Sequence, residues 1–205
     1  MKLIVAATKN KGKIREIQEM TEKEGIPVRS MEEMGVSLDV EETGTTFEEN
    51  ALLKARAVWE ALGEEYLVIA DDSGLEIDFF DGRPGIYSSR WLGEDTPYEI
   101  KNRTILEKMK NVPEEKRGAR YVCAIAAVTG SGREYCVTET LEGQVAFAEK
   151  GQGGFGYDPI IWLPEQGRTV AELLPEEKNA LSHRGKALRK IEQLLRQEGV
   201  LWSRG

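Results

Sequence analysis

The sequence is poor in cysteine and histidine, the side chains that hold most transition metals and carry much nucleophilic catalysis. Its 205 residues include two cysteines, Cys123 and Cys136, and one histidine, His183. Two cysteines without CxxC spacing fit reduced core thiols better than a disulfide staple or a zinc site. A single histidine excludes sites built from several imidazoles. A serine-hydrolase triad is also disfavoured, because the chain has no GxSxG turn to present the serine.

Long apolar runs and excess positive charge are missing as well. No run reaches the 18 apolar residues of a membrane-spanning helix, and the opening apolar run, residues 3–7, is too short for a signal peptide. Lys and Arg number 28 against 36 Asp and Glu, which gives a net charge of −8. Such a balance disfavours general binding to nucleic acids or to anionic membranes. We therefore expect a cytoplasmic protein with no nucleic-acid partner and no membrane partner.

Length and composition fit one globular domain over residues 1–205, with 40% hydrophobic residues. Its charges are segregated along the chain. Residues 9–15 carry four bases and no acid, residues 30–53 carry seven acids and no base, and residues 178–205 carry seven bases and two acids. Charge runs are usually solvated helix faces. The alternative is that the basic ends and the acidic middle meet on a metal-bound polyphosphate.

Buried apolar runs alternate with amphipathic stretches. We expect helices over residues 13–24, 46–62, 96–110 and 182–198, and strands over residues 3–7, 66–70, 75–79, 121–129 and 134–148. Thr46 with Glu49, and Thr96 with Glu99, have the spacing of capping boxes at helix starts. The strand–helix units, with a long β-hairpin turned at residues 130–132, predict an α/β fold with a mixed sheet flanked by helices.

A lysine-rich loop follows the first expected strand. It consists of Thr8, Lys9, Asn10, Lys11, Gly12 and Lys13. Backbone amides and the positive end of the helix dipole favour phosphate oxygens at such a helix start. Gly12 permits close approach of the backbone, and the lysines add positive charge. The spacing is not that of a Walker A loop, so an ordinary strand-to-helix turn remains the alternative.

Acidic side chains occur where two expected strands meet. Asp71 and Asp72 follow the buried run 66–70, at the kind of strand end where open sheets bind ligands. Carboxylates without nearby histidine suit a hard cation such as Mg²⁺. The alternative is a turn, because Asp, Ser and Gly all favour turns. Glu41 and Glu42 are candidates for a further metal ligand or for a solvated loop.

Two further segments carry chemistry near the end of the chain. Residues 151–156 hold four glycines beside Phe155 and Tyr157, so a pliable loop could offer an aromatic face to a flat base. The alternative is a flexible loop with its aromatic rings in the core. Residues 178–184 then bring the only histidine, His183, together with basic side chains at an expected helix start.

In this order, the segments resemble the inosine/xanthosine triphosphate pyrophosphatases, a family that removes non-standard purine nucleotides. The matching segments are residues 8–13, 41–44, 47–51, 70–75, 84–88, 154–159 and 182–185. Each is weak alone, but the ordered set spans nearly the whole chain and is specific. One departure is Lys9, where the family's first loop usually has glycine. A positive φ at that position would strain a lysine.

The resemblance implies an elongated, two-lobed fold around a central cleft and a homodimer. It implies Mg²⁺-dependent hydrolysis of ITP, dITP and XTP to the monophosphate and pyrophosphate. Asp72 would be a metal ligand and the base that activates water, and Glu41 would help to hold the metal. The substrate would be bound by Thr8, Lys9, Asn10, Lys11, Gly12, Lys13, Ser73, Phe155, Gly156, Tyr157, Asp158, Lys178, His183 and Arg184. Among these, Phe155 would stack on the base, and His183 and Arg184 would read it or close the site.

Three other functions remain open at this point. The chain could be a pyrophosphatase for modified pyrimidine nucleotides, which a panel of bases would distinguish. It could bind nucleotides without hydrolysing them, although the acidic segments argue against that. It could also bind RNA, which the net charge of −8 disfavours.

Overall fold

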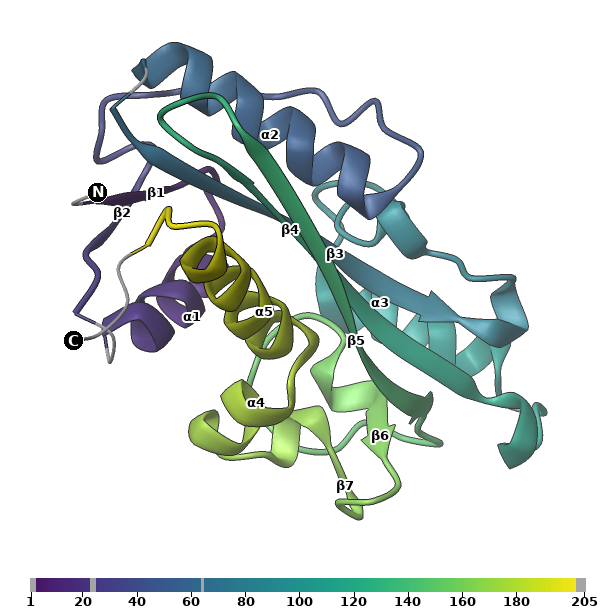
Figure 1. Cartoon of the computed structure of the whole chain (residues 1–205). Coiled ribbons are helices and arrows are strands. Elements are labelled where there is room, and N and C mark those ends of the chain that lie inside the picture. The colour runs from purple at the N-terminus through teal and green to yellow at the C-terminus, as the bar shows by residue number, and fades with distance from the viewer. Residues whose placement is uncertain (1–2, 23–24, 64, 202–205) are drawn as a thin grey trace. The chain divides into compact units, whose positions relative to one another are not determined.

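The computed structural model describes residues 3–22, 25–63 and 65–201 of an α/β protein (Figure 1). Seven strands form one sheet in the order β2-β1-β3-β4-β5-β6-β7. Their bounds are β1 Ile4–Ala6, β2 Val28–Ser30, β3 Leu67–Ile77, β4 Gly118–Val128, β5 Glu134–Val145, β6 Ile161–Leu163 and β7 Arg168–Thr169. β1 pairs in parallel with β2 and β3, whereas β6 pairs antiparallel with β5 and β7. The expected mixed sheet is therefore confirmed.

Five α-helices accompany the sheet in the described residues. They are α1 Lys11–Glu22, α2 Phe47–Leu62, α3 Tyr98–Lys108, α4 Pro175–Leu181 and α5 His183–Gln197. All four expected helices are present, with shifted ends; residues 23 and 24 of the first lie outside the described residues. The sequence did not predict α4, β2, β6 or β7, because elements of two to seven residues are too short to show a periodicity.

The two expected capping boxes are only partly present. Thr46 does cap α2, since its side chain accepts from the Glu49 amide at 3.1 Å. The Glu49 carboxylate, however, accepts from the amide and hydroxyl of Thr45 rather than completing the box at Thr46. The box at Thr96 was wrong: Pro97 is the residue that precedes α3, and the Thr96 hydroxyl donates to the Leu92 carbonyl at 2.7 Å.

The chain divides into two compact units. Unit 1 comprises the described residues of Met1–Asp72, Cys123–Glu139 and Arg184–Gly205; unit 2 comprises Ser73–Val122 and Thr140–His183. Each unit has its own hydrophobic core. Since β3, β4 and β5 each contribute residues to both units, the ends of these three strands belong to different cores.

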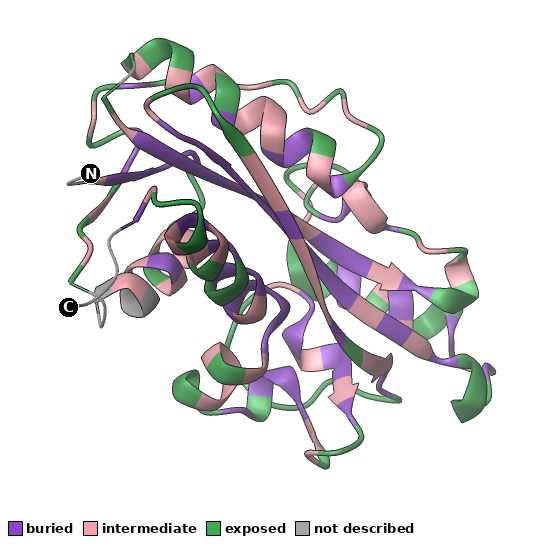
Figure 2. Ribbon diagram, in the orientation of Figure 1, coloured by how far each residue is buried: buried purple, intermediate pink, exposed green. Residues whose placement is uncertain are grey.

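Unit 1 is layered around its part of the sheet. One core joins apolar residues of α1 and α5 to Ile4 and Ala6 of β1 and to Leu67 and Ile69 of β3. Helix α2 lies on the opposite face of these strands (Figure 1). Strand residues alternate between the two faces, so the strands are buried on both, as Figure 2 shows for β3 and β4.

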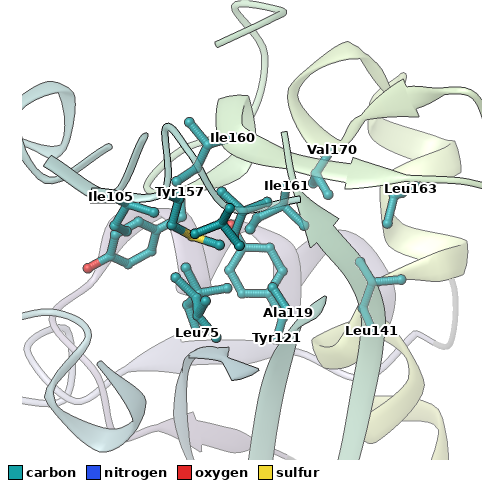
Figure 3. Close-up of a cluster of buried hydrophobic side chains, with 14 of the residues drawn as sticks. Leu75, Ile105, Ala119, Tyr121, Leu141, Tyr157, Ile160, Ile161, Leu163 and Val170 are labelled. Atoms are coloured by element: carbon teal, nitrogen blue, oxygen red, sulfur yellow. The ribbon is translucent and has the colours of Figure 1, made fainter. Parts of the chain in front are cut away.

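Unit 2 packs α3 and β6 against the other ends of the long strands. Figure 3 shows its core, in which Leu75, Ile105 and Ile161 surround the rings of Tyr121 and Tyr157. The two tyrosine rings therefore belong to the core, and their hydroxyls need buried partners.

The structure also bears on the cysteines and on the expected absence of a membrane-spanning helix. Cys123 is buried and Cys136 half-buried, and both are free thiols, so the expectation of a core thiol holds fully only for Cys123. Within the described part of the chain, no helix has the length and apolar content that crossing a bilayer requires.

Candidate active site

The two adjacent aspartates lie within a strand and not at its end. Sequence reasoning divided residues 66–79 into two strands joined at the Asp-Asp-Ser-Gly segment, but the structure has one continuous strand, β3, of 11 residues. Successive side chains on a strand point to opposite faces. Asp71 therefore shares the face of Leu67 and Ile69 toward α1 and α5, and Asp72 faces α2. A shared metal ion on one face of the sheet is excluded for this pair.

Asp71 is the centre of a buried ion-pair network. Its side chain accepts from Lys13 Nζ at 3.1 Å and from Arg184 Nε at 3.1 Å, and Arg184 also pairs with Glu16 of α1. Burial opposes the charge of Asp71, but the lysine and arginine outweigh it, so the pKa of Asp71 lies well below its usual range. Asp71 is thus an ionised carboxylate that ties β3 to α1 and to the start of α5.

Asp72 has a different environment on the other face. Its Oδ1 accepts from Lys54 Nζ at 3.0 Å, and the same ammonium donates to Glu42 Oε1 at 2.8 Å. Burial raises the pKa of Asp72, and the charge of Glu42 raises it further, while Lys54 and Lys13 offset this only in part. A buried carboxylate with a raised pKa is suited to accept a proton.

The second carboxylate of this cluster is Glu42. The residue pattern offered Glu41 and Glu42 alike, and the resemblance to the family implied Glu41. Glu41 is exposed, and Glu42 is half-buried against Lys54. The structure therefore brings Glu42, Lys54 and Asp72 together and leaves Glu41 outside. The metal-binding role expected for Glu41 stays a prediction.

The lysine-rich loop before α1 is organised by Asn10. The Asn10 side-chain oxygen accepts from the amides of Gly12 and Lys13 at 2.9 and 3.2 Å, and Thr8 Oγ1 accepts from the Asn10 amide at 3.1 Å. Two of the amides expected to bind phosphate are thus occupied by a helix cap. Lys11 lies exposed at the first residue of α1.

Lys9, which departs from the family's usual glycine, is not strained. Among the described residues other than glycine, only Asp81 and Leu92 have positive φ. The Lys9 ammonium lies 3.5 Å from the Asp39 carboxylate on the surface of unit 1. Its phosphate contact stays a prediction.

In unit 2, the buried carboxylate of Asp158 joins three donors. It accepts from the Tyr121 hydroxyl at 2.9 Å, from the Phe155 amide at 2.9 Å and from Lys178 Nζ at 3.0 Å. Asp158 therefore shapes the loop 154–158 and holds Lys178 beside it. Its expected contact with the nucleotide stays a prediction.

The two aromatic residues of this loop differ in their exposure to solvent. Tyr157 is buried: its hydroxyl donates to the Ser88 carbonyl at 2.7 Å and its ring packs edge-on against Tyr98. Phe155 is 41% exposed, with Lys178 Nζ 4.3 Å from the ring centroid. Gly156 has φ +69°, a conformation that favours glycine. Phe155 is thus the aromatic face that a base can reach.

The remaining expected residues lie near the aspartates already described, Asp71 and Asp72 in unit 1 and Asp158 in unit 2. His183 stacks on Tyr121 with ring centroids 4.8 Å apart, so its ring is fixed inside unit 2. Ser73 is half-buried on β3, directly after Asp72. Arg184 is buried against Asp71 and Glu16, and its contact with a base stays a prediction.

Sequence reasoning missed Asn50, Lys54 and Tyr121. Asn50 and Lys54 are four residues apart on α2, which places both on one helix face, and both donate to Asp72. That spacing, two polar residues on the otherwise apolar face of an expected helix, was the available signal. Nothing in the sequence distinguished Tyr121 from the apolar residues around it.

The comparison with known proteins agrees with this arrangement. The model of the Ham1 family matches residues 4–194. The chain belongs to the Ham1 family. The dITP/XTP pyrophosphatase of Geobacillus kaustophilus is 50% identical over 194 residues, which cover 94% of this chain and 94% of that protein. The dITP/XTP pyrophosphatase of Exiguobacterium sibiricum is 46% identical over 195 residues, covering 95% of this chain and 97% of that protein.

Solved structures of this family have the same fold. The Staphylococcus aureus Ham1 protein superposes with a TM-score of 0.85 at 39% identity, covering 96% of this chain and all of that one. A HAM1 protein from Coxiella burnetii gives a TM-score of 0.83 at 37% identity, with 96% and 100% coverage. The resemblance found in the ordered motifs is thereby confirmed.

Proposed function

We propose that this Ham1 protein hydrolyses non-canonical purine nucleoside triphosphates, namely ITP, dITP and XTP, to the monophosphate and pyrophosphate. The names of its relatives support the reaction and the substrate class. The observation that carries the assignment in this chain is Asp72, a buried carboxylate with a raised pKa that shares the Lys54 ammonium with Glu42.

The acidic cluster fits Mg²⁺. Glu42 and Asp72 would offer hard oxygen ligands, and their two negative charges exceed the single positive charge of Lys54 between them. No cluster of three or more potential ligand side chains occurs within residues 3–22, 25–63 and 65–201. Mg²⁺ commonly binds through one or two carboxylates together with water and substrate phosphates. When bound, the ion would neutralise phosphate charge and polarise the bond that breaks.

The chain's own residues then have separate tasks. Asp72 accepts the proton of the attacking water as the new phosphorus–oxygen bond forms and the anhydride between the α- and β-phosphates breaks. Pyrophosphate leaves with the electron pair of the broken bond. Lys54 offsets the negative charge that develops on the phosphate oxygens. Lys11, exposed at the start of α1, binds the outer phosphates.

Base selection belongs to the loop 154–158. Phe155 stacks on the purine, and Lys178 supplies a donor beside it. Hypoxanthine and xanthine accept a hydrogen bond at the 6-oxygen, where adenine presents a donor. Adenine therefore leaves donors of the pocket unpaired, which is a strong basis for rejection.

The direct test separates products from a nucleotide panel incubated with and without Mg²⁺. We expect pyrophosphate and monophosphate from dITP and XTP, little turnover of dATP, and loss of turnover with EDTA. Orthophosphate and diphosphate as the products would contradict the proposal. The homodimer and the cytoplasmic location stay predictions, and light scattering on the purified chain tests the first.

A further inference from the structure

Asn50 is a fully buried polar side chain on the face of α2 that lies against β3. Its exposure is 0%, and a buried carboxamide must find hydrogen-bond partners. Its Oδ1 accepts from the Gly44 amide at 2.8 Å, and its Nδ2 donates to Asp72 Oδ2 at 3.4 Å. The orientation of the amide is fixed by chemistry, because the Gly44 N–H can only donate and the carboxylate can only accept.

Gly44 is pressed directly against this side chain. A Cβ at Gly44 would lie 2.6 Å from Asn50 Oδ1 and 2.7 Å from Glu49 Cβ, closer than real Cβ atoms approach. The loop that carries Glu42 two residues earlier is thus seated on the first turn of α2. Asn50 thus connects this loop, through the Gly44 amide, to Asp72.

We infer that Asn50 is a positioning residue, which holds the Glu42 loop and the Asp72 carboxylate at a fixed separation. Lys54 also bridges Glu42 and Asp72, but it does so by charge and from a flexible side chain. Asn50 has a short side chain on a helix, and one of its bonds is made to the loop backbone. It therefore fixes geometry without changing the charge of the cluster.

The consequence for turnover rests on the proposed function, but the structural half of the inference does not. Asn50→Leu keeps the number and branching of the side-chain heavy atoms and removes both hydrogen bonds. We expect the Gly44 amide, followed by NMR with ¹⁵N-glycine labelling, to exchange with solvent at least about tenfold faster in this variant. An unchanged Gly44 exchange rate would overturn the inference even if the wild-type chain hydrolyses no nucleotide.

The kinetic half compares Asn50→Leu with Val58→Ala. Val58 is 1% exposed on the same helix and makes none of the bonds to Asp72, so it reports loss of packing alone. With dITP as substrate, we expect Asn50→Leu to lower kcat by about ten- to a hundredfold with little change in KM. We also expect Asn50→Leu to raise the Mg²⁺ concentration that gives a half-maximal rate. Val58→Ala should lower Tm but leave kcat and this Mg²⁺ concentration unchanged.

A second variant protects the test against misfolding. Asn50→Ser keeps a small polar group but cannot span from Gly44 to Asp72, and it should show the same fall in kcat and rise in Mg²⁺ requirement. Both variants retaining kcat within about twofold of the wild type would overturn the inference. Absence of wild-type turnover, together with fast Gly44 exchange in Asn50→Leu, would reject the proposed function and leave the positioning contact established.

Discussion

At the scale of single residues, Asp71 and Asp72 show how one step along a strand separates structure from chemistry. Asp71 is 1% exposed and faces Lys13 and Arg184, whose charges keep it ionised. Asp72 faces α2, where burial and Glu42 make its charge less favourable. The same side chain is thus a structural anion in one position and a candidate base in the next.

Replacing Asp72 should affect turnover and not folding. Asp72→Asn removes the proposed proton acceptor and metal ligand, so we expect kcat for dITP to fall by at least about a hundredfold. Burial raises the pKa of Asp72 in the folded protein, so ionisation of this carboxylate has a cost in stability that its pairing with Lys54 offsets only in part. We expect the free energy of unfolding in urea to be unchanged or higher, and near-normal turnover with Mg²⁺ would contradict the assignment.

Replacing Asp71 should destabilise the fold, and Asp71→Asn serves as the matched control for the stability of Asp72→Asn. Asp71→Asn leaves Lys13 and Arg184 buried beside a neutral group, which typically costs about 3–5 kcal/mol of stability. Urea denaturation measures this loss. A variant as stable as the wild type would show that the network contributes little to the fold.

The residue pattern gave Asp71 and Asp72 as a pair of candidate ligands, and only the resemblance to the family selected Asp72. The Asp-Asp-Ser-Gly segment has strong turn propensity, but its pairing within the sheet, which no local pattern shows, keeps it extended as part of β3. Glu41 and Glu42 posed the same difficulty, because which of two adjacent loop residues turns inward depends on where Lys54 lies.

At the scale of elements, the loop 154–158 is built around Asp158. Its three donors come from β4, from the loop itself and from α4, so one carboxylate fixes the backbone and the Lys178 side chain together. The exposed Phe155 is consequently held on a rigid support.

Truncation of Phe155 should weaken substrate binding. Stacking of a base on an aromatic ring contributes about 1–3 kcal/mol. We therefore expect Phe155→Ala to raise KM for dITP about five- to a hundredfold with a smaller effect on kcat. Steady-state kinetics across a range of dITP concentrations measures both, and an unchanged KM would remove Phe155 from the base site.

The conformation of this loop can be tested at Gly154. It has φ +71°, and a Cβ there would collide with Asp158 Oδ2, so Gly154→Ala should displace Asp158 and raise KM. Gly167→Ala is the matched control, because Gly167 has φ +61° and nothing within 4 Å of the added atom. Equal kinetic effects of the two variants would indicate that backbone strain alone is responsible.

Element positions were predictable from the sequence wherever the apolar pattern was long. The 16-residue helix α2 followed from its pattern and from Gly63, which has φ +84° and ends it. The role of Thr96 at the start of α3 was not predictable, because its hydroxyl donates to the Leu92 carbonyl in the preceding turn and does not cap the helix.

At the scale of the whole molecule, the net charge of −8 conceals how the charges are used. Two of the acids in residues 30–53 accept from nearby backbone amides, Glu33 from Ser30 and Glu49 from Thr45. Two bases of the run 9–15 likewise form ion pairs within the protein, Lys13 with Asp71 and Lys9 with Asp39. The sequence shows that the charges are segregated, but it does not show which of them pair within the fold and which are left to bind a ligand.

Acid stability follows from the same network. The pKa of Asp71 is lower in the folded protein than in the unfolded chain, where it is about 3.9. The unfolded chain therefore binds more protons, and the contribution of Asp71 to stability is present above that pH and lost as the pH falls through the folded pKa. We expect the stability difference between wild type and Asp71→Asn to be constant near pH 7 and to shrink below about pH 4. A difference that does not change with pH would contradict the ion-pair account.

The most direct measurement of the central claim follows the products of dITP hydrolysis in Mg²⁺ by ³¹P NMR, for the wild type and for Asp72→Asn. We expect dIMP and pyrophosphate in equal amounts from the wild type, with no orthophosphate, and almost no product from the variant. Release of orthophosphate by the wild type, or an Asp72→Asn variant that still produces pyrophosphate at the wild-type rate, would contradict it.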